Sequence, residues 1–214
     1  MKKIILFDLD GTLIDSTEAI LESFQHALKK HGKQTPISDT LITSQIGHTL
    51  ETMFAGVGIE EAMIDEHVAT YKLYYREISR QKTVLLPGAM EAVRTASQFA
   101  RLGIVTTKTG LYSRELMEHF EMMHYFEVLI GREHVENPKP HPEPILKALE
   151  QMGQPVSSVW MIGDTRLDIE ASKRAGIECV AVTSGYDNKE QLLTLTDIIK
   201  NDALEAVQYI AQRG

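Results

Sequence analysis

Ile-Ile-Leu-Phe-Asp-Leu-Asp-Gly-Thr-Leu, residues 4–13, is the stretch of sequence that decides the fold. Its apolar residues 4–7 predict a buried strand of the kind found in parallel sheets. Asp8 and Asp10 follow at once, and two carboxylates at a buried strand end repel each other and lose hydration unless a cation or a chemical role holds them there. Gly11 permits a tight turn that brings backbone close to a ligand. The stretch therefore predicts a functional site at the end of a strand.

The second half of the chain alternates between short apolar runs and amphipathic segments. Strands alternating with helices favour a parallel sheet that carries helices on both faces, and ligands of such sheets bind beyond the carboxyl ends of the strands. We expect an α/β fold with a Rossmann-like, doubly wound parallel sheet. The predicted strands are 103–106, 126–130, 159–162 and 177–182, and the predicted helices are 89–101, 111–120, 142–152 and 166–175.

The segment between the first strand and residue 83 has a different pattern. Apolar residues recur there at helical spacing, and no convincing strand interrupts them. The expected helices follow the first turn and then occupy residues near 38–46, 49–56 and 60–81. We therefore predict an α/β core of residues 1–15 and 83–214 with an all-helical insert of residues 16–82.

Composition excludes several classes of protein. The 214 residues are 43% hydrophobic and 24% charged, as in ordinary globular proteins, and the net charge is −8 without a basic block. We expect no nucleic-acid partner, because an acidic surface repels phosphates. No apolar run approaches the ~20 residues that span a bilayer, so we expect no membrane association. The single cysteine, Cys179, excludes an internal disulfide, and together these features favour a cytoplasmic protein.

Three later segments place polar residues directly after predicted strands or between prolines. Thr106 and Thr107 end one strand, where a threonine pair is also a common helix cap. Lys139 stands between two prolines, where a solvated loop lysine is the alternative. Asp164 and Asp168 lie on one face at the start of a helix, where they could simply cap it. If these carboxylates meet Asp8 and Asp10, they form an oxygen-rich site that suits Mg²⁺.

Four segments resemble, in order, the four motifs of the haloacid dehalogenase (HAD) superfamily. Residues 8–12 have the pattern D-x-D-G-T of motif I, and residues 103–108 resemble motif II. Asn137-Pro138-Lys139-Pro140 resembles motif III, and residues 163–168 have the pattern G-D-x-x-x-D of motif IV. The helical insert resembles the C1 cap of the phosphoglycolate phosphatase-like branch. The resemblance covers nearly the whole chain.

The resemblance implies a role for each matching residue. Asp8 is the expected nucleophile, and Asp10 is the expected general acid and base. Thr106 is expected to hydrogen-bond a phosphate oxygen, and Lys139 to neutralise Asp8 and the phosphate. Thr107 and the backbone at Gly11 are expected to help bind substrate. The implied Mg²⁺ ligands are Asp8, the backbone carbonyl of Asp10, and Asp164, while Asp168 is expected to orient the metal-bound waters.

In the insert, residues 45–50 lie where related caps carry a glycine-centred substrate loop. His48 is a candidate to bind the leaving group, and an uninvolved surface histidine is the alternative.

The predicted function is a Mg²⁺-dependent phosphatase that acts on a small phosphorylated metabolite through an aspartyl-phosphate, with phosphoglycolate and pyrophosphate as first substrates. A phosphosugar or nucleotide phosphatase and a phosphosugar mutase remain alternatives. A phosphoryl-accepting signalling module and a binding protein without turnover are further alternatives from other classes.

Overall fold

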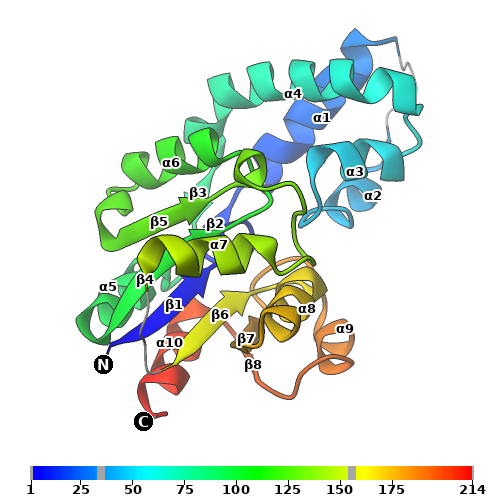
Figure 1. The fold of residues 1–214 in the computed structure, drawn as a ribbon. Coiled ribbons are helices and arrows are strands. Elements are labelled where there is room, and N and C mark those ends of the chain that lie inside the picture. The colour runs from blue at the N-terminus through cyan, green and yellow to red at the C-terminus, as the bar shows by residue number, and fades with distance from the viewer. Residues whose placement is uncertain (1, 33–36, 154–157, 214) are drawn as a thin grey trace.

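A six-stranded parallel sheet forms the centre of the molecule (Figure 1). The computed structural model describes residues 2–32, 37–153 and 158–213. The strand order is β5-β4-β1-β6-β7-β8, so that β1 lies between β4 and β6. The predicted α/β fold with a parallel sheet is confirmed. The strands are β1 (Lys3–Phe7), β4 (Ala100–Val105), β5 (Phe126–Ile130), β6 (Val159–Gly163), β7 (Glu178–Val182) and β8 (Ile199–Lys200).

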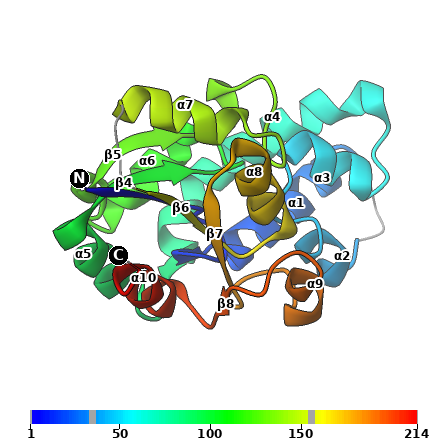
Figure 2. The same cartoon turned by 60° about the horizontal axis from the view of Figure 1, so that its bottom comes forward.

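Helices cover both faces of this sheet, as Figure 2 shows. Ile5 and Phe7 pack with one set of helices, and Ile4 and Leu6 pack with the other, because successive side chains of a strand point to opposite faces. All four side chains are fully buried, which explains why the run is apolar throughout. The first set is α5 (Ala89–Phe99), α6 (Gly110–His119) and α10 (Ala203–Ala211), and the second is α7 (Glu143–Met152) and α8 (Arg166–Ala175), with the short α9 (Lys189–Leu193) beside it.

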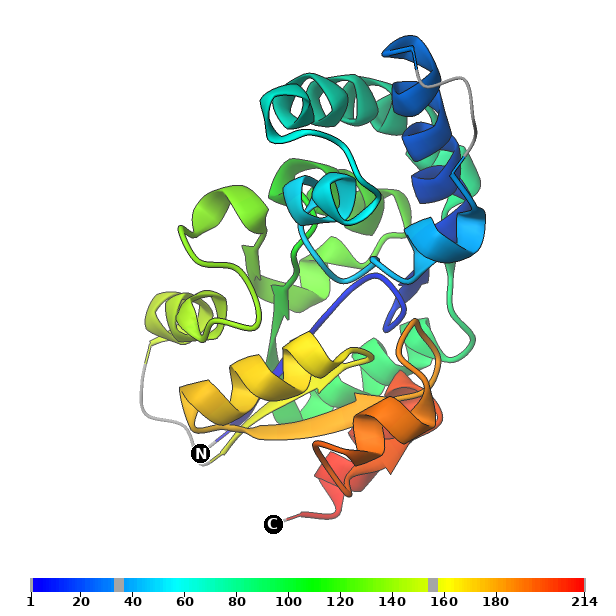
Figure 3. The same ribbon diagram turned by 90° about the vertical axis from the view of Figure 1, so that its right-hand side faces the viewer.

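Four helices between β2 and β3 form a second, separate hydrophobic cluster. Phe24 stacks on Phe54 with ring centroids 4.1 Å apart, and Tyr71 meets Phe24 edge-on. Figures 1 and 3 show these helices beyond the carboxyl ends of the central strands. The helices are α1 (Thr17–Lys30), α2 (Asp39–Thr43), α3 (Leu50–Gly56) and α4 (Glu61–Lys82). Their division from the core at residues 16 and 82 remains our interpretation.

Both connections to these helices run through one short ribbon. The strands β2 (Ile14–Asp15) and β3 (Val84–Leu85) pair antiparallel, with Ile14 opposite Leu85 and Asp15 opposite Val84. The chain therefore leaves the core and returns to it at the same place.

Two parts of the core differ from the sequence prediction. The helix expected over residues 89–101 ends at Phe99, and the strand expected from Gly103 begins at Ala100. The reason is pairing, because Ala100 to Leu102 add to β4 opposite Lys3 to Ile5 of β1. The elements after residue 182, namely α9, β8 and α10, were not predicted. Single 3₁₀ turns occur at Met123–Tyr125 and Arg132–His134. Among the described residues, none of the helices has the length and apolar character that a membrane span needs.

Candidate active site

The three central strands end in the polar residues that the sequence singled out. Asp8 follows β1, Thr106 follows β4 and Asp164 follows β6. The Asp8 amide still donates to the carbonyl of Ile162 at 2.9 Å, so the catalytic candidate is held by the sheet itself. Because β1 lies between the other two strands, the three residues meet at one edge of the sheet.

Lys139 joins two of the predicted carboxylates. Its Nζ lies 3.0 Å from Oδ1 of Asp8 and 2.5 Å from Oδ1 of Asp168, and it donates to the carbonyl of Val105 at 3.1 Å. The residue is only 4% exposed. Burial disfavours the ammonium, but the charges of Asp168 and Asp8 outweigh it and raise the pKa of Lys139. The lysine is thus a buried, permanently charged partner and not a solvated loop residue.

Asp164 is held by hydrogen bonds from two segments of the core. Its Oδ1 accepts from Thr12 Oγ1 at 3.0 Å, and its Oδ2 accepts from the Tyr186 amide at 2.9 Å. Gly11 has a φ of +82°, and a Cβ there would lie 2.3 Å from Oδ2 of Asp164. A glycine at position 11 is therefore required for the close approach of Asp164.

The backbone of Gly11 is itself engaged. Its N–H donates to the carbonyl of Ile14 at 2.8 Å, and its carbonyl accepts from Ser184 Oγ at 2.8 Å. Direct binding of substrate by Gly11 stays a prediction.

The buried carboxylates can hold a metal ion. Oxygen atoms of Asp8, Asp164 and Asp168 lie within 4.8 Å of one another. Burial raises the pKa of Asp8 from 3.8 to about 7, against the opposing charge of Lys139. Burial and the charges of Asp8 and Asp168 raise the pKa of Asp164 well above its ordinary value. One lysine does not balance three carboxylates, so a cation fits the site by charge and by its oxygen ligands.

Asp168 is engaged by the protein through both of its carboxylate oxygens. Oδ1 faces Lys139, and Oδ2 accepts from the amide of Thr165 at 3.1 Å and from its Oγ1 at 2.7 Å. It therefore caps α8 and positions Lys139. An additional contact of Asp168 with metal-bound water stays a prediction.

Asp10 stands apart from this cluster and has partners of its own. Its Oδ2 lies 2.9 Å from Nζ of Lys108, and its Oδ1 accepts a hydrogen bond from Ser16 Oγ. The Lys108 ammonium also lies 4.7 Å from the centre of the Tyr75 ring, which belongs to α4 of the insert. Neither Lys108 nor Ser16 was predicted from the sequence to be a site residue. The position of Lys108, directly after the threonine pair, was the only signal available for it.

The two threonines after β4 have different surroundings. Thr106 Oγ1 accepts from the Lys108 amide at 3.2 Å, which fits the turn-capping alternative, and phosphate binding by Thr106 stays a prediction. Thr107 Oγ1 donates to the carbonyl of Gly47 at 2.8 Å and so joins the core to the insert. A Cβ at Gly47 would lie 3.0 Å from Cγ2 of Thr165. The glycine-centred loop therefore rests on the residues that follow β4 and β6.

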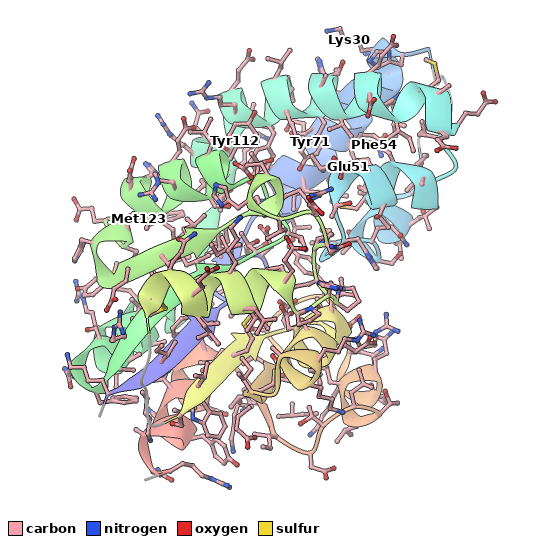
Figure 4. The ribbon with its side chains drawn as sticks, viewed as in Figure 1. Lys30, Glu51, Phe54, Tyr71, Tyr112 and Met123 are labelled. Atoms are coloured by element: carbon pink, nitrogen blue, oxygen red, sulfur yellow. The ribbon has the colours of Figure 1, made fainter. Side chains whose placement is uncertain are left out.

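A cavity lies between this loop, the helices of the insert and the core. His48 contributes to its wall, and burial, followed by the charge of Arg166, lowers the pKa of this imidazole. Binding of a leaving group by His48 stays a prediction. Figure 4 shows the insert residues Tyr71 and Glu51 and the core residue Tyr112 in this region. The wall combines apolar side chains with charged ones, and Asp10 and Lys108 belong to it.

Comparisons with known proteins agree with this geometry. A phosphoglycolate phosphatase from Aquifex aeolicus is 31% identical over 187 residues, covering 86% of each chain. The "Probable phosphatase IndB" of Dickeya dadantii is 31% identical over 199 residues, covering 90% of this chain and 86% of the relative. A crystal structure of a haloacid dehalogenase-like hydrolase from Bacteroides fragilis superimposes with a TM-score of 0.90 and 28% identity, covering 96% of this chain and all of that one. The family model described as haloacid dehalogenase-like hydrolase matches residues 5–182, and the chain therefore belongs to that family.

Proposed function

We propose that this protein is a Mg²⁺-dependent phosphatase that hydrolyses a small phosphorylated metabolite through an aspartyl-phosphate on Asp8. The observation that carries the proposal is the position of Asp8, which faces the Lys139 ammonium at 3.0 Å beside Asp164. Oδ1 of Asp8 faces the Lys139 ammonium at 3.0 Å without a hydrogen bond of good geometry to any described residue, and a carboxylate oxygen with two lone pairs can accept a further partner. The names of the phosphatase relatives support the same reaction.

Mg²⁺ would be held by Asp8, by Asp164 and by the backbone carbonyl of Asp10. When bound, it neutralises charge on the carboxylates and on the transferred phosphoryl group. Lys139 adds a fixed positive charge on the side of Asp8 that faces Asp168. With both charges in place, the Asp8 carboxylate and a phosphate dianion can approach each other in a site from which water is largely excluded.

The reaction needs one nucleophile and one proton carrier. A carboxylate oxygen of Asp8 attacks phosphorus, the bond to the leaving oxygen breaks, and Asp10 gives that oxygen a proton. Asp10 then accepts a proton from the water that attacks phosphorus, and the bond between Asp8 and phosphorus breaks to release phosphate. Lys108 and Ser16 hold the Asp10 carboxylate in place for both steps.

The helical insert acts as a cap over this site. Its loop at Gly47 contacts Thr107 and Thr165, which stand on either side of Asp8 in the sheet. Closure of the cap limits the access of bulk water to the aspartyl-phosphate and encloses the leaving group.

Phosphoglycolate is the first substrate to test, followed by pyrophosphate. The test is phosphate release from both compounds and from p-nitrophenyl phosphate, with Mg²⁺ and with EDTA. We expect turnover of p-nitrophenyl phosphate that EDTA abolishes and excess Mg²⁺ restores. A pure, folded sample that releases phosphate from none of these compounds, nor from a wider panel of phosphorylated metabolites, would contradict the proposed function.

A further inference from the structure

Arg132 and Glu51 form an unusual pair across the cavity between cap and core. Arg132 follows β5 of the core, and Glu51 lies in the first turn of α3. Their nearest atoms, Nε and Oε2, are 3.9 Å apart, which is too long for a hydrogen bond. Both atoms are buried and neither has a hydrogen-bond partner among the described residues, although the two side chains as a whole are 32% and 41% exposed. Leaving a buried donor and a buried acceptor unpaired is costly, so the pair is poorly explained as a purely structural contact.

Two hydrogen bonds hold Arg132 in place, and the edge of its guanidinium group that carries Nε faces Glu51. Its backbone amide donates to the carbonyl of Lys108 at 3.0 Å, and its Nη1 donates to the carbonyl of Val135 at 3.0 Å. The guanidinium is therefore fixed relative to Lys108, whose ammonium contacts Asp10. A rigid guanidinium edge is well suited to a carboxylate.

The spacing of the strands fits a short substrate. Arg132 follows β5, two places from β1 in the sheet, or about 10 Å at the usual strand separation. A phosphoryl group at Asp8 with a leaving group of two or three carbons can bridge much of this distance, and the arginine side chain covers the rest. Tyr71, Tyr75 and Met53 line the same cavity and offer apolar contact to the carbon atoms.

The charges of the cavity wall favour one additional negative charge. Lys72, Lys108 and Arg132 line it against the two acids Asp10 and Glu51. Asp10 is paired with Lys108 at 2.9 Å, while Glu51 is only loosely placed beside Arg132. A monoanionic group on the substrate would therefore find a net positive surrounding.

We propose that Arg132 binds a carboxylate on the leaving group of the substrate and that Glu51 is the counter-charge which this carboxylate displaces. The proposal rests on the proposed phosphatase function and names the substrate class as short phosphorylated hydroxy acids. Glu51 then weakens binding of the substrate, and Arg132 strengthens it, so their removal has opposite effects. A simple ion pair that closes the cap predicts the same loss from removal of either partner.

The experiment compares matched substrates. Phosphoglycolate, phospholactate and 3-phosphoglycerate carry the carboxylate, and ethyl phosphate, isopropyl phosphate and glycerol 3-phosphate are their neutral counterparts. The readout is the ratio of kcat/KM within each pair. We expect the wild type to favour the acid in at least one pair. Arg132→Gln should lower that ratio by about 10- to 100-fold, the effect of one charge-assisted hydrogen bond. Arg132→Lys should recover part of it.

Glu51→Gln should raise the same ratio by several-fold, through a lower KM for the acid. Glu115→Gln is the matched control, because Glu115 of α6 pairs with Arg76 of α4 at 2.8 Å and also joins core to cap without lining the cavity. It should leave the ratio unchanged.

The inference is overturned if the wild type favours the neutral member of every pair, or if Arg132→Gln and Glu51→Gln change the ratio in the same direction or not at all. Turnover of p-nitrophenyl phosphate by the wild type separates these outcomes from a failure of the phosphatase function itself. A thermal melt of each variant shows whether it is folded.

Discussion

The strand-end site and the cap are built from different kinds of residue, and we assign them different functions. At the strand ends, Asp8, Lys139 and Asp164 are buried charges held by the sheet and by one another. In the cap, the helices pack around Phe24, Phe54 and Tyr71, and polar contacts such as the hydrogen bond from Thr107 to Gly47 join them to the core. Under the proposed function, the rigid charges serve a chemical step that every substrate shares, and the apolar layer of the cap serves discrimination between leaving groups. Changes at the strand ends should thus affect all substrates equally, and changes at the cap should not.

The largest effect is expected for Asp8→Asn. The substitution keeps the shape of the side chain and removes the attacking carboxylate, so turnover of every substrate should fall by about 10⁴-fold or more. Phosphate release measures this, and circular dichroism checks the fold. Asp65→Asn, an exposed change on α4, is the control and should retain full activity. Appreciable turnover by pure Asp8→Asn protein would rule out the covalent mechanism.

A smaller but still general loss is expected for Asp164→Ala. A lost metal ligand should raise the Mg²⁺ concentration needed for half-maximal activity and lower kcat by about 10³-fold. Asp168→Ala acts through Lys139 and should cost about 10- to 100-fold, with a smaller change in Mg²⁺ dependence. Activation curves with increasing Mg²⁺ distinguish the two variants. The assignment of ligands is wrong if Asp168→Ala shifts the Mg²⁺ curve further than Asp164→Ala does.

The strand-end charges should also make stability depend on pH when metal is removed. Burial raises the pKa of Asp8 from 3.8 to about 7, so the folded state retains a proton that the unfolded chain releases. The stabilising contribution is complete below about pH 4 and is lost as the pH rises to 7. In EDTA, Tm should therefore fall between pH 5 and pH 8. A loss of about 1 kcal/mol in the free energy of unfolding lowers Tm by about 2–4 °C in a domain of this size, and we expect a fall of at least that extent.

Added Mg²⁺ should reverse this fall, because it binds the ionised carboxylates of the folded state. The Asp8→Asn variant is the control, since it lacks the titrating group and should show a flatter profile. Identical slopes for the wild type and Asp8→Asn would show that other groups cause the pH dependence.

The smallest effect is expected at the contact between Thr107 and Gly47. Thr107→Val removes the hydrogen bond that joins the core to the cap loop, and one such bond contributes about 0.5–1.5 kcal/mol. We expect kcat/KM to fall by about 2- to 10-fold, mainly through KM and by different amounts for different substrates. Thr107→Ser retains the hydroxyl and should behave like the wild type. A uniform loss of kcat across substrates would place Thr107 in the common chemistry.

The contrast between the two regions also explains what the sequence could predict. Asp8 and Asp164 each stand directly after an apolar strand, where an isolated charge has few structural explanations, and Lys139 is marked by its flanking prolines. Asp8 and Asp164 meet because the carboxyl ends of parallel strands lie at one edge of the sheet, whereas the position of Lys139 depends on the loop before α7. Other contacts depend on how the cap docks on the core. They are the pairing of Arg132 with Glu51 and the contact of the Lys108 ammonium with the Tyr75 ring. Docking is decided by contacts between segments far apart in the chain, so no local pattern reveals it.

The same limit applies to the elements that were missed. Ala100 to Leu102 join β4 because β1 offers them partners, although their sequence continues a helical pattern. The strand β8 has only two residues and gains its place from pairing with β7. Short strands carry too few residues for a periodicity to be visible, and their existence is settled by neighbours in the sheet.

Because β2 and β3 pair, the cap is one contiguous segment of the chain whose two ends lie side by side. Ile14 and Leu85 are direct neighbours across the ribbon, so the two points where the chain enters and leaves the cap are only one strand separation apart, about 5 Å. A short turn has the right span to close that gap in place of residues 16–83. An inserted segment whose own ends lie equally close could take the same place without disturbing the sheet. The ribbon therefore allows the covering layer to be exchanged or lengthened during evolution while the strand ends, and the chemistry they hold, are inherited intact.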